Sequence, residues 1–256
     1  KQAYTDAGVY ISARDFDARN LSGTEMAERL GKAPLAQQPG TTWEYSLSVD
    51  IQGRVIEAVT GQRLNDFMQE RLFKPLKMQE TGFTVPTANA GRVAEPFAAD
   101  PATGVPNKLI DVSQTPGNDS GGAGGVSTAP DYLRFCQAML NGGQLDGARI
   151  LSRSTVQLMT SDHLGTAIAT PVSPGQLLFG SPGYTFGLGF LVRQGDGIAP
   201  VHGSAGEFMW AGYAGTYFWA DPKEQLCGVF MSQSPGPTRA YYRRMLKTLV
   251  AQALID

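Results

Sequence analysis

The stretch Pro39-Gly40-Thr41-Thr42-Trp43-Glu44-Tyr45-Ser46-Leu47-Ser48 is the most informative part of the chain. Its Pro-Gly pair is typical of a turn. The following residues, 48–60, carry apolar side chains at spacings that suit one face of a helix, namely Val49, Val55, Ile56 and Val59. Gly61 is placed to end that helix. The sequence therefore predicts a turn that leads directly into a helix, with Trp43 and Tyr45 at the junction.

Further patterns extend from this segment towards the C-terminus. We expect helices at about 63–73, 131–140, 152–160 and 237–254, and a long irregular segment at 84–125. We expect strands at Phe186–Val192, Glu207–Ala220 and Leu226–Ser232, the last two joined by a hairpin turn at 221–224. Helices, then meander strands, then a terminal helix indicate an α+β fold with an antiparallel sheet. We divide it into a mostly helical region with long loops, 1–183, and a strand-rich region with the C-terminal helix, 184–256.

Composition excludes several classes of protein. Of the 256 residues, 42% are apolar and 17% are charged, and the formal net charge is −2. Such a composition is typical of a globular protein. The chain lacks the excess of positive charge that would favour binding to nucleic acid or to an anionic membrane. No apolar run is long enough to span a bilayer, and the N-terminus has no signal-peptide pattern. The isolated cysteines do not indicate a disulfide framework, and with them we expect a cytoplasmic protein. The two separated cysteines, Cys136 and Cys227, are expected to be small buried apolar side chains.

A catalytic nucleophile is hard to find within the sequence. Asn118-Asp119-Ser120-Gly121-Gly122 is similar to the serine motif of chymotrypsin-like proteases, but that family needs its histidine earlier in the chain. His163 and His202 both follow Ser120, and they are too far apart to predict a metal site. No Gly-x-Ser-x-Gly elbow is present, and none of the seven lysines has a serine three residues before it. Ser120 is therefore expected in a glycine-rich turn, bonded to local backbone groups.

Four segments in order resemble the class C β-lactamases and family VIII carboxylesterases, relatives of penicillin-binding proteins. The first is the tyrosine motif at 39–48. The second comprises 55–61 and 72–78, which are similar to the next two helices of that family. The third is the glycine-rich 120–128 with the helix start after it. The fourth is Trp210-Ala211-Gly212, where the esterases carry Trp-x-Gly and the β-lactamases Lys-Thr-Gly. The resemblance covers about 35–254 and implies a β-lactamase/transpeptidase-like fold.

The resemblance also implies a chemistry and a set of site residues. A serine forms an acyl-enzyme, and Tyr45 takes part in its proton relay, which requires a nearby cation because a phenol ordinarily titrates near pH 10. The amide of Tyr213 is the implied oxyanion donor, and Gly212 lets the substrate approach closely. Leu47 and Trp210 stand where the β-lactamases have Asn and Lys, so we expect an apolar pocket for uncharged esters. The simpler alternatives are Tyr45 packed on Trp43, and ordinary strand burial of Trp210.

In the family, the Ser-x-x-Lys helix lies N-terminal to the tyrosine motif. We therefore expect the fold to be incomplete in this chain, and a complementary N-terminal polypeptide to supply the serine and lysine. We expect no cofactor and no metal ion. The alternatives are a β-lactamase or acyltransferase of the same fold, or a non-catalytic ligand-binding protein.

Overall fold

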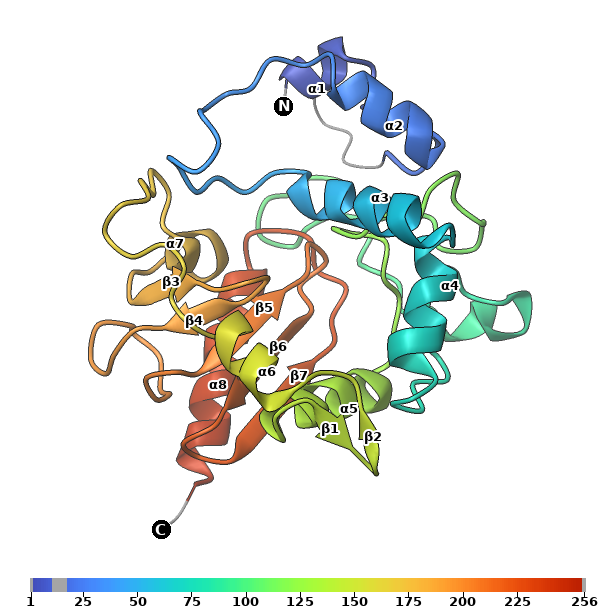
Figure 1. Cartoon of the computed structure of the whole chain (residues 1–256). Helices are drawn as coiled ribbons and strands as arrows, with labels where there is room; N and C mark the ends of the chain where they lie inside the picture. The colour runs from blue at the N-terminus through green and yellow to red at the C-terminus, as the bar shows by residue number, and fades with distance from the viewer. Residues whose placement is uncertain (1, 11–17, 255–256) are drawn as a thin grey trace.

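Five antiparallel strands form the main sheet of the computed structural model, which describes residues 2–10 and 18–254 (Figure 1). Their order in the sheet is the same as their order in the chain, so each strand pairs with the next one. The strands are β3 (Tyr184–Phe186), β4 (Leu191–Arg193), β5 (Phe208–Ala211), β6 (Tyr217–Asp221) and β7 (Leu226–Phe230). A small separate ribbon pairs β1 (Gln144–Leu145) with β2 (Ala148–Arg149). The predicted α+β class with an antiparallel meander is confirmed.

Two of the three expected strands are wrong in extent, because each is a hairpin. The expected strand 186–192 turns back on itself, so that Phe186 of β3 pairs with Leu191 of β4. The expected strand 207–220 is β5 and β6, and Trp210 pairs with Phe218 across the turn between them. Apolar residues continue through both turns, so an apolar run alone could not show where the chain reverses.

The helices follow the predictions more closely. The predicted helix at 48–60 is α3 (Ser48–Thr60), and Gly61 ends it with a φ of 71°, a conformation that glycine adopts without strain. The expected helix at 63–73 begins as α4 (Leu64–Met68) and continues as the π-helix η1 (Gln69–Phe73). Three more predicted helices are α5 (Ala129–Leu140), α6 (Arg153–Met159) and α8 (Arg239–Gln252). The sequence reasoning missed α1 (Gln2–Asp6), α2 (Gly23–Leu30), the 3-10 helix η2 (Thr87–Arg92) and α7 (Pro174–Phe179).

Helices cover both faces of the sheet. On one face, Leu246 and Val250 of α8 pack against a buried cluster that includes Met209, Tyr217 and Trp219. On the other face, Cys136 and Met139 of α5 pack with side chains that alternate with those, Phe208 and Phe218 among them. Both cysteines are free; Cys136 is buried as expected and Cys227 is half-buried. The division at 183 and 184 remains a prediction, although α5 from the first region packs directly on β6 and β7.

Two observations on the helices remain. No described helix is long and apolar enough to cross a membrane. On α3, Val55 and Val59 of the predicted apolar face are exposed, whereas the buried positions of this helix are Asp50 and Gly53. The helix therefore uses a polar side to contact the rest of the described chain and leaves apolar side chains uncovered.

Candidate active site

Tyr45 lies just before α3, in a segment held by backbone hydrogen bonds to a distant loop. The Trp43 amide donates to the Ala169 carbonyl at 2.8 Å, and the Ala169 amide donates to the Thr41 carbonyl at 3.0 Å. The Trp43 ring packs against Phe186 of β3, with 5.2 Å between centroids. This anchoring holds the start of α3 against the end of the sheet, and the Tyr45 side chain remains 56% exposed.

The structure brings together two residues that the sequence analysis assigned to the site from distant segments. The Tyr45 ring lies 5.8 Å from the Trp210 ring, centroid to centroid. Phe186 contacts Trp210 from another side at 5.5 Å, so an aromatic row runs from Trp43 through Phe186 and Trp210 to Tyr45. Within the described part of the chain, the ring that Tyr45 contacts is therefore Trp210, not Trp43 as the simpler alternative expected.

Electrostatics at Tyr45 keep its hydroxyl protonated. Partial burial raises the pKa of Tyr45 above its ordinary value, the Asp50 carboxylate raises it further, and Arg239 lowers it in part. Arg239 is the first residue of α8, and the sequence reasoning did not select it. The sequence feature that could have indicated Arg239 is the arginine-rich start of α8. Because the net direction is upward, Tyr45 needs a further cation beside it before it can act as a base near neutral pH.

The glycine-rich segment at 120–125 forms a support for α3. The Ser120 hydroxyl donates a hydrogen bond to the Asp50 carboxylate and accepts one from the Ala123 amide at 3.0 Å. A Cβ at Gly122 would lie 2.4 Å from the nearer Asp50 oxygen, so this close approach requires glycine. The expected glycine-rich turn is confirmed, but the partner of Ser120 includes a distant side chain as well as local backbone. Ser120 thus positions the acid beside Tyr45.

The β5–β6 turn carries Gly212 and Tyr213 just beyond Trp210. The Gly212 amide donates to the Thr216 carbonyl at 2.9 Å, which closes the turn. Two arginines of α8 hold its carbonyls: Arg243 donates to Gly212 O and Arg239 donates to Tyr213 O, each at 2.6 Å. The Arg239 guanidinium also lies 5.3 Å from the centroid of the Tyr213 ring. The Tyr213 amide, which is the predicted oxyanion donor, therefore belongs to a turn that two arginines of α8 hold in place.

A comparison with known protein families shows which family the chain belongs to. The sequence model of a family described as beta-lactamase matches the chain over residues 5–252. The chain belongs to the beta-lactamase family. The resemblance predicted from the motifs is thereby confirmed.

Individual members of the beta-lactamase family agree with this assignment. Protein Rv1367c of Mycobacterium tuberculosis is 32% identical over 212 residues, which cover 80% of this chain and 52% of that protein. Lovastatin esterase of Penicillium rubens is 31% identical over 233 residues, which cover 83% of this chain and 55% of that enzyme. The chain thus spans about half the length of the curated relatives that it matches. Named relatives in the family are hydrolases, esterases and carboxypeptidases among them.

A solved structure supports the same fold. EstCE1, described as a hydrolase with promiscuous acyltransferase activity, matches with a TM-score of 0.74 at 21% identity, over 96% of this chain and 65% of that chain. This likeness confirms the β-lactamase/transpeptidase-like fold.

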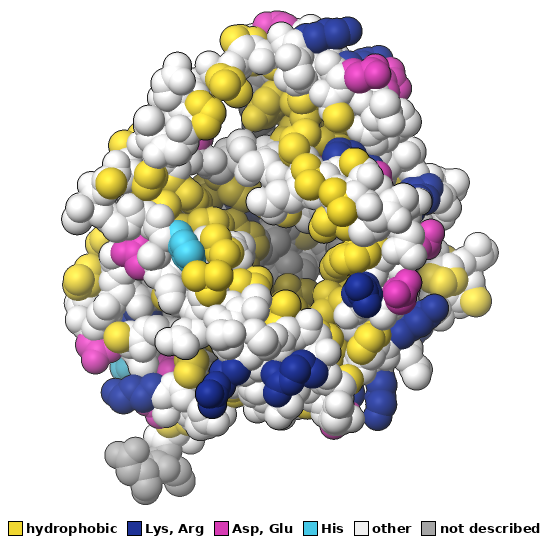
Figure 2. Space-filling view, in the orientation of Figure 1, with side chains coloured by type: hydrophobic (Ala, Val, Ile, Leu, Met, Phe, Trp, Pro, Cys, Tyr) yellow, Lys and Arg dark blue, Asp and Glu magenta, His cyan; other side chains and the backbone are white. Residues whose placement is uncertain are grey.

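In the space-filling view, the face between α3, α5 and the sheet is hollowed, and apolar side chains gather around the hollow (Figure 2).

Leu47 lies apart from the aromatic row. Its side chain packs against a buried cluster at the N-terminus that includes Val9, Tyr10 and Met26. Trp210, by contrast, is half-buried at the end of β5 and packs towards both core clusters of the sheet. A direct contact between Leu47 and a substrate therefore remains a prediction, and the structure places this side chain next to α2.

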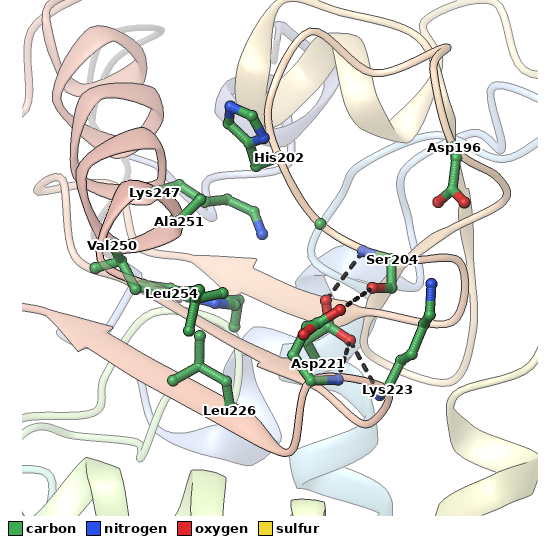
Figure 3. A pocket seen from close by; sticks show the side chains of 13 residues that line it. Asp196, His202, Ser204, Asp221, Lys223, Leu226, Lys247, Val250, Ala251 and Leu254 are labelled. Carbon is green, nitrogen blue, oxygen red and sulfur yellow. Dashed lines mark hydrogen bonds between the residues drawn. The ribbon is translucent and has the colours of Figure 1, made fainter. Parts of the chain in front are cut away.

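The two histidines lie in different parts of the structure, and the His163 amide donates to the Phe186 carbonyl of β3 at 3.1 Å. A ring nitrogen of His163 lies 2.8 Å from the Leu158 carbonyl oxygen. His202 lines a cavity of about 300 Å³ between the C-terminal half of α8 and the β6–β7 hairpin, where Ser204 and Lys247 also point (Figure 3). Tyr45 does not line this cavity. Among the described residues, no three His, Cys, Asp or Glu side chains are grouped to hold a metal ion.

Glu207 forms a buried ion pair with Lys247 beside this cavity. This ion pair predicts that the stability of the folded chain depends on pH. Burial raises the pKa of Glu207 to about 7, against the partial opposition of Lys247 and Arg193 and with a further upward contribution from Asp221. Between about pH 4.5 and 7, the folded protein therefore holds a proton that the unfolded chain has lost. We expect the free energy of unfolding to fall as pH rises through this window.

Urea denaturation across this pH range measures that effect, with Glu207→Gln as the non-titrating control. The difference in unfolding free energy between the native chain and the variant should decrease as pH rises and then level off above about pH 7. Tyr184 also faces Glu207, but burial raises its pKa above this range. Two parallel stability curves would contradict the expected titration.

Proposed function

We propose that this chain is part of a serine hydrolase that cleaves carboxylic esters through an acyl-enzyme. The observation that carries the proposal is the position of Tyr45, exposed at the start of α3 beside Trp210 and near the β5–β6 turn. The esterases among its relatives support this reaction class. A phenol at the mouth of an apolar, aromatic site can exchange a proton with a hydroxyl nucleophile.

The proposed reaction divides the roles between this chain and a complementary polypeptide. A serine oxygen bonds to the ester carbonyl carbon, and Tyr45 relays the serine proton to the departing alcohol. Water then cleaves the acyl-serine bond and releases the acid, which restores the serine. A lysine from the complementary polypeptide provides the cation that Tyr45 requires, because Asp50 and burial together outweigh Arg239 at the phenol.

Uncovered apolar side chains support the proposed complementary polypeptide. Val55 and Val59 of α3 are exposed, and so are Tyr241, Met245 and Leu249, which follow one another at four-residue spacing on α8. Contiguous exposed apolar surfaces are typical of protein contacts. In the proposed complex, the complementary polypeptide covers these exposed apolar side chains of α3 and α8.

The proposed preference for uncharged esters rests on Trp210, which stands where the β-lactamases carry a lysine. The native enzyme should hydrolyse p-nitrophenyl butyrate with a higher kcat/KM than mono-p-nitrophenyl succinate, which has a similar length and a carboxylate. The opposite order would favour a pocket organised around Arg239, the cation that the structure places near Tyr45.

A fluorophosphonate probe tests the acyl-enzyme directly on native material. We expect one labelled serine, in the polypeptide that accompanies this chain, and loss of esterase activity in proportion to labelling. Intact mass spectrometry of the native material identifies the companion. Material that neither reacts with the probe nor turns over esters would favour the non-catalytic binding protein.

A further inference from the structure

Arg243 is a buried cation on α8, and the described carboxylates do not pair with it. Its side chain is part of a residue only 2% exposed, and in the described part of the chain it forms no ion pair. Burial, and then the neighbouring charge of Arg239, lower its pKa to about 10. A buried charge that lacks a charged partner is costly and must be held by several polar groups. Such a residue calls for a reason beyond the packing of a helix on a sheet.

The groups that hold Arg243 are backbone carbonyls. Nη2 donates to the Gly212 carbonyl at 2.6 Å and to the Thr216 carbonyl at 3.4 Å, and Nη1 donates to the Leu178 carbonyl at 3.4 Å. The shortest of these contacts joins the guanidinium to one peptide group in the β5–β6 turn. Of the three carbonyl oxygens that accept from this cation, that of Gly212 is the nearest, by 0.8 Å.

The Gly212 carbonyl and the Tyr213 N–H belong to the same peptide group. A cation that hydrogen-bonds to the oxygen of a peptide draws electron density towards that oxygen and makes its N–H a stronger donor, since hydrogen bonds in a chain polarise one another. Charge-assisted bonds of this kind are about twice as strong as neutral ones. The effect is larger in a buried setting, where water does not screen the charge.

We propose that Arg243 is a positioning residue of the oxyanion site, which orients and polarises the Gly212–Tyr213 peptide group. Arg239, one helical turn earlier, holds the next carbonyl of the turn, that of Tyr213. The two arginines thus fix successive peptide planes from the same face of α8. The inference rests on the proposed function, because it assigns Arg243 to the donor that would bind the oxyanion of the acyl-transfer step.

The test is a charge series at position 243 in the native complex: Arg243→Lys, Arg243→Gln and Arg243→Met. With Arg243→Gln we expect kcat for p-nitrophenyl butyrate to fall about tenfold to a hundredfold with KM within about threefold, since the donor acts on charge that develops in the transition state. Arg243→Lys keeps the charge and should retain most of the activity. Arg243→Met should lose at least as much as Arg243→Gln.

Two further measurements separate this role from a structural one. The affinity of a boronic acid analogue of the tetrahedral intermediate should fall in proportion to kcat/KM across the series. The amide proton resonance of Tyr213, measured by NMR on the native complex, should move upfield in Arg243→Gln, whether or not the sample is active. If Arg243→Met does not fold, the comparison of Lys with Gln at this position still decides the effect of charge.

Arg244→Gln is the matched control, because Arg244 is the next residue of α8 and donates to the Phe179 carbonyl instead, at 3.1 Å. Its activity should stay within about twofold of the native enzyme. Equal kcat in Arg243→Gln and the native enzyme, with an unmoved Tyr213 amide, would overturn the inference and leave the ester hydrolase proposal intact. A native complex without turnover or probe labelling would instead overturn the proposed function, and the Tyr213 resonance would still report on polarisation.

Discussion

Tyr45→Phe should lower the turnover of ester substrates by at least about a hundredfold, because a positioned proton-transfer group contributes about 10²- to 10⁴-fold. The substitution removes only the phenol oxygen. The ring that packs 5.8 Å from Trp210 stays in place, so binding of an apolar acyl group should change little. The loss should therefore appear mainly in kcat, with KM within a fewfold.

Stopped-flow or steady-state hydrolysis of p-nitrophenyl butyrate by the native complex measures this effect. Tyr242→Phe is the matched control, since that phenol lies on α8, is 37% exposed, and belongs neither to the candidate site nor to the exposed row of Tyr241, Met245 and Leu249. It should leave kcat unchanged. Retention of most of the turnover in Tyr45→Phe would remove Tyr45 from the proton relay and would assign the proton transfer to another group.

Lys247→Met should destabilise the chain by about 3 kcal/mol, as expected when one partner of a buried ion pair is removed. Glu207 is 0% exposed, Lys247 is 3% exposed, and the pair joins the residue before β5 to the middle of α8. Methionine keeps most of the aliphatic volume of lysine. The destabilisation should lie at the lower end of the range for buried pairs because Glu207, with a pKa of about 7, can take up a proton and become neutral.

Urea or thermal unfolding followed by circular dichroism measures this loss. The double variant Glu207→Leu/Lys247→Met should recover much of the stability, because replacing a whole buried pair by apolar groups is often close to neutral. Lys223→Met, on the β6–β7 hairpin, serves as a control for the loss of one positive charge. Equal destabilisation by the single and double variants would show that the pair has no coupling and that packing alone accounts for the effect.

The local pattern of the sequence predicted most of the helices, because their signals are contained within a few turns. The apolar spacing at 48–60 and Gly61 define α3 to the residue, and the Thr128 hydroxyl caps α5 by accepting a hydrogen bond from the Asp131 amide. The strands were harder to delimit. The β3–β4 and β5–β6 reversals lie inside apolar runs, and only the pairing of Phe186 with Leu191 and of Trp210 with Phe218 reveals them.

Tyr45 and Trp210 could be selected from sequence because each lies in a short motif with its own spacing. Their contact at 5.8 Å could not, since it joins segments that are brought together by the folding of the sheet against the loop at 163–170. Asp50, Arg239 and Arg243 carry no motif of their own. They matter because the tertiary structure places them beside a phenol or a carbonyl, and this placement sets their electrostatic effect.

The sequence by itself therefore determined the family and the α3 helix, and it predicted the chemical type of the site. These features depend on residue identity and short-range spacing. The tertiary structure alone decided which charges face Tyr45 and which peptide group Arg243 holds. Electrostatic interactions depend on distance and on exclusion of water, and both are known only once the segments are packed together.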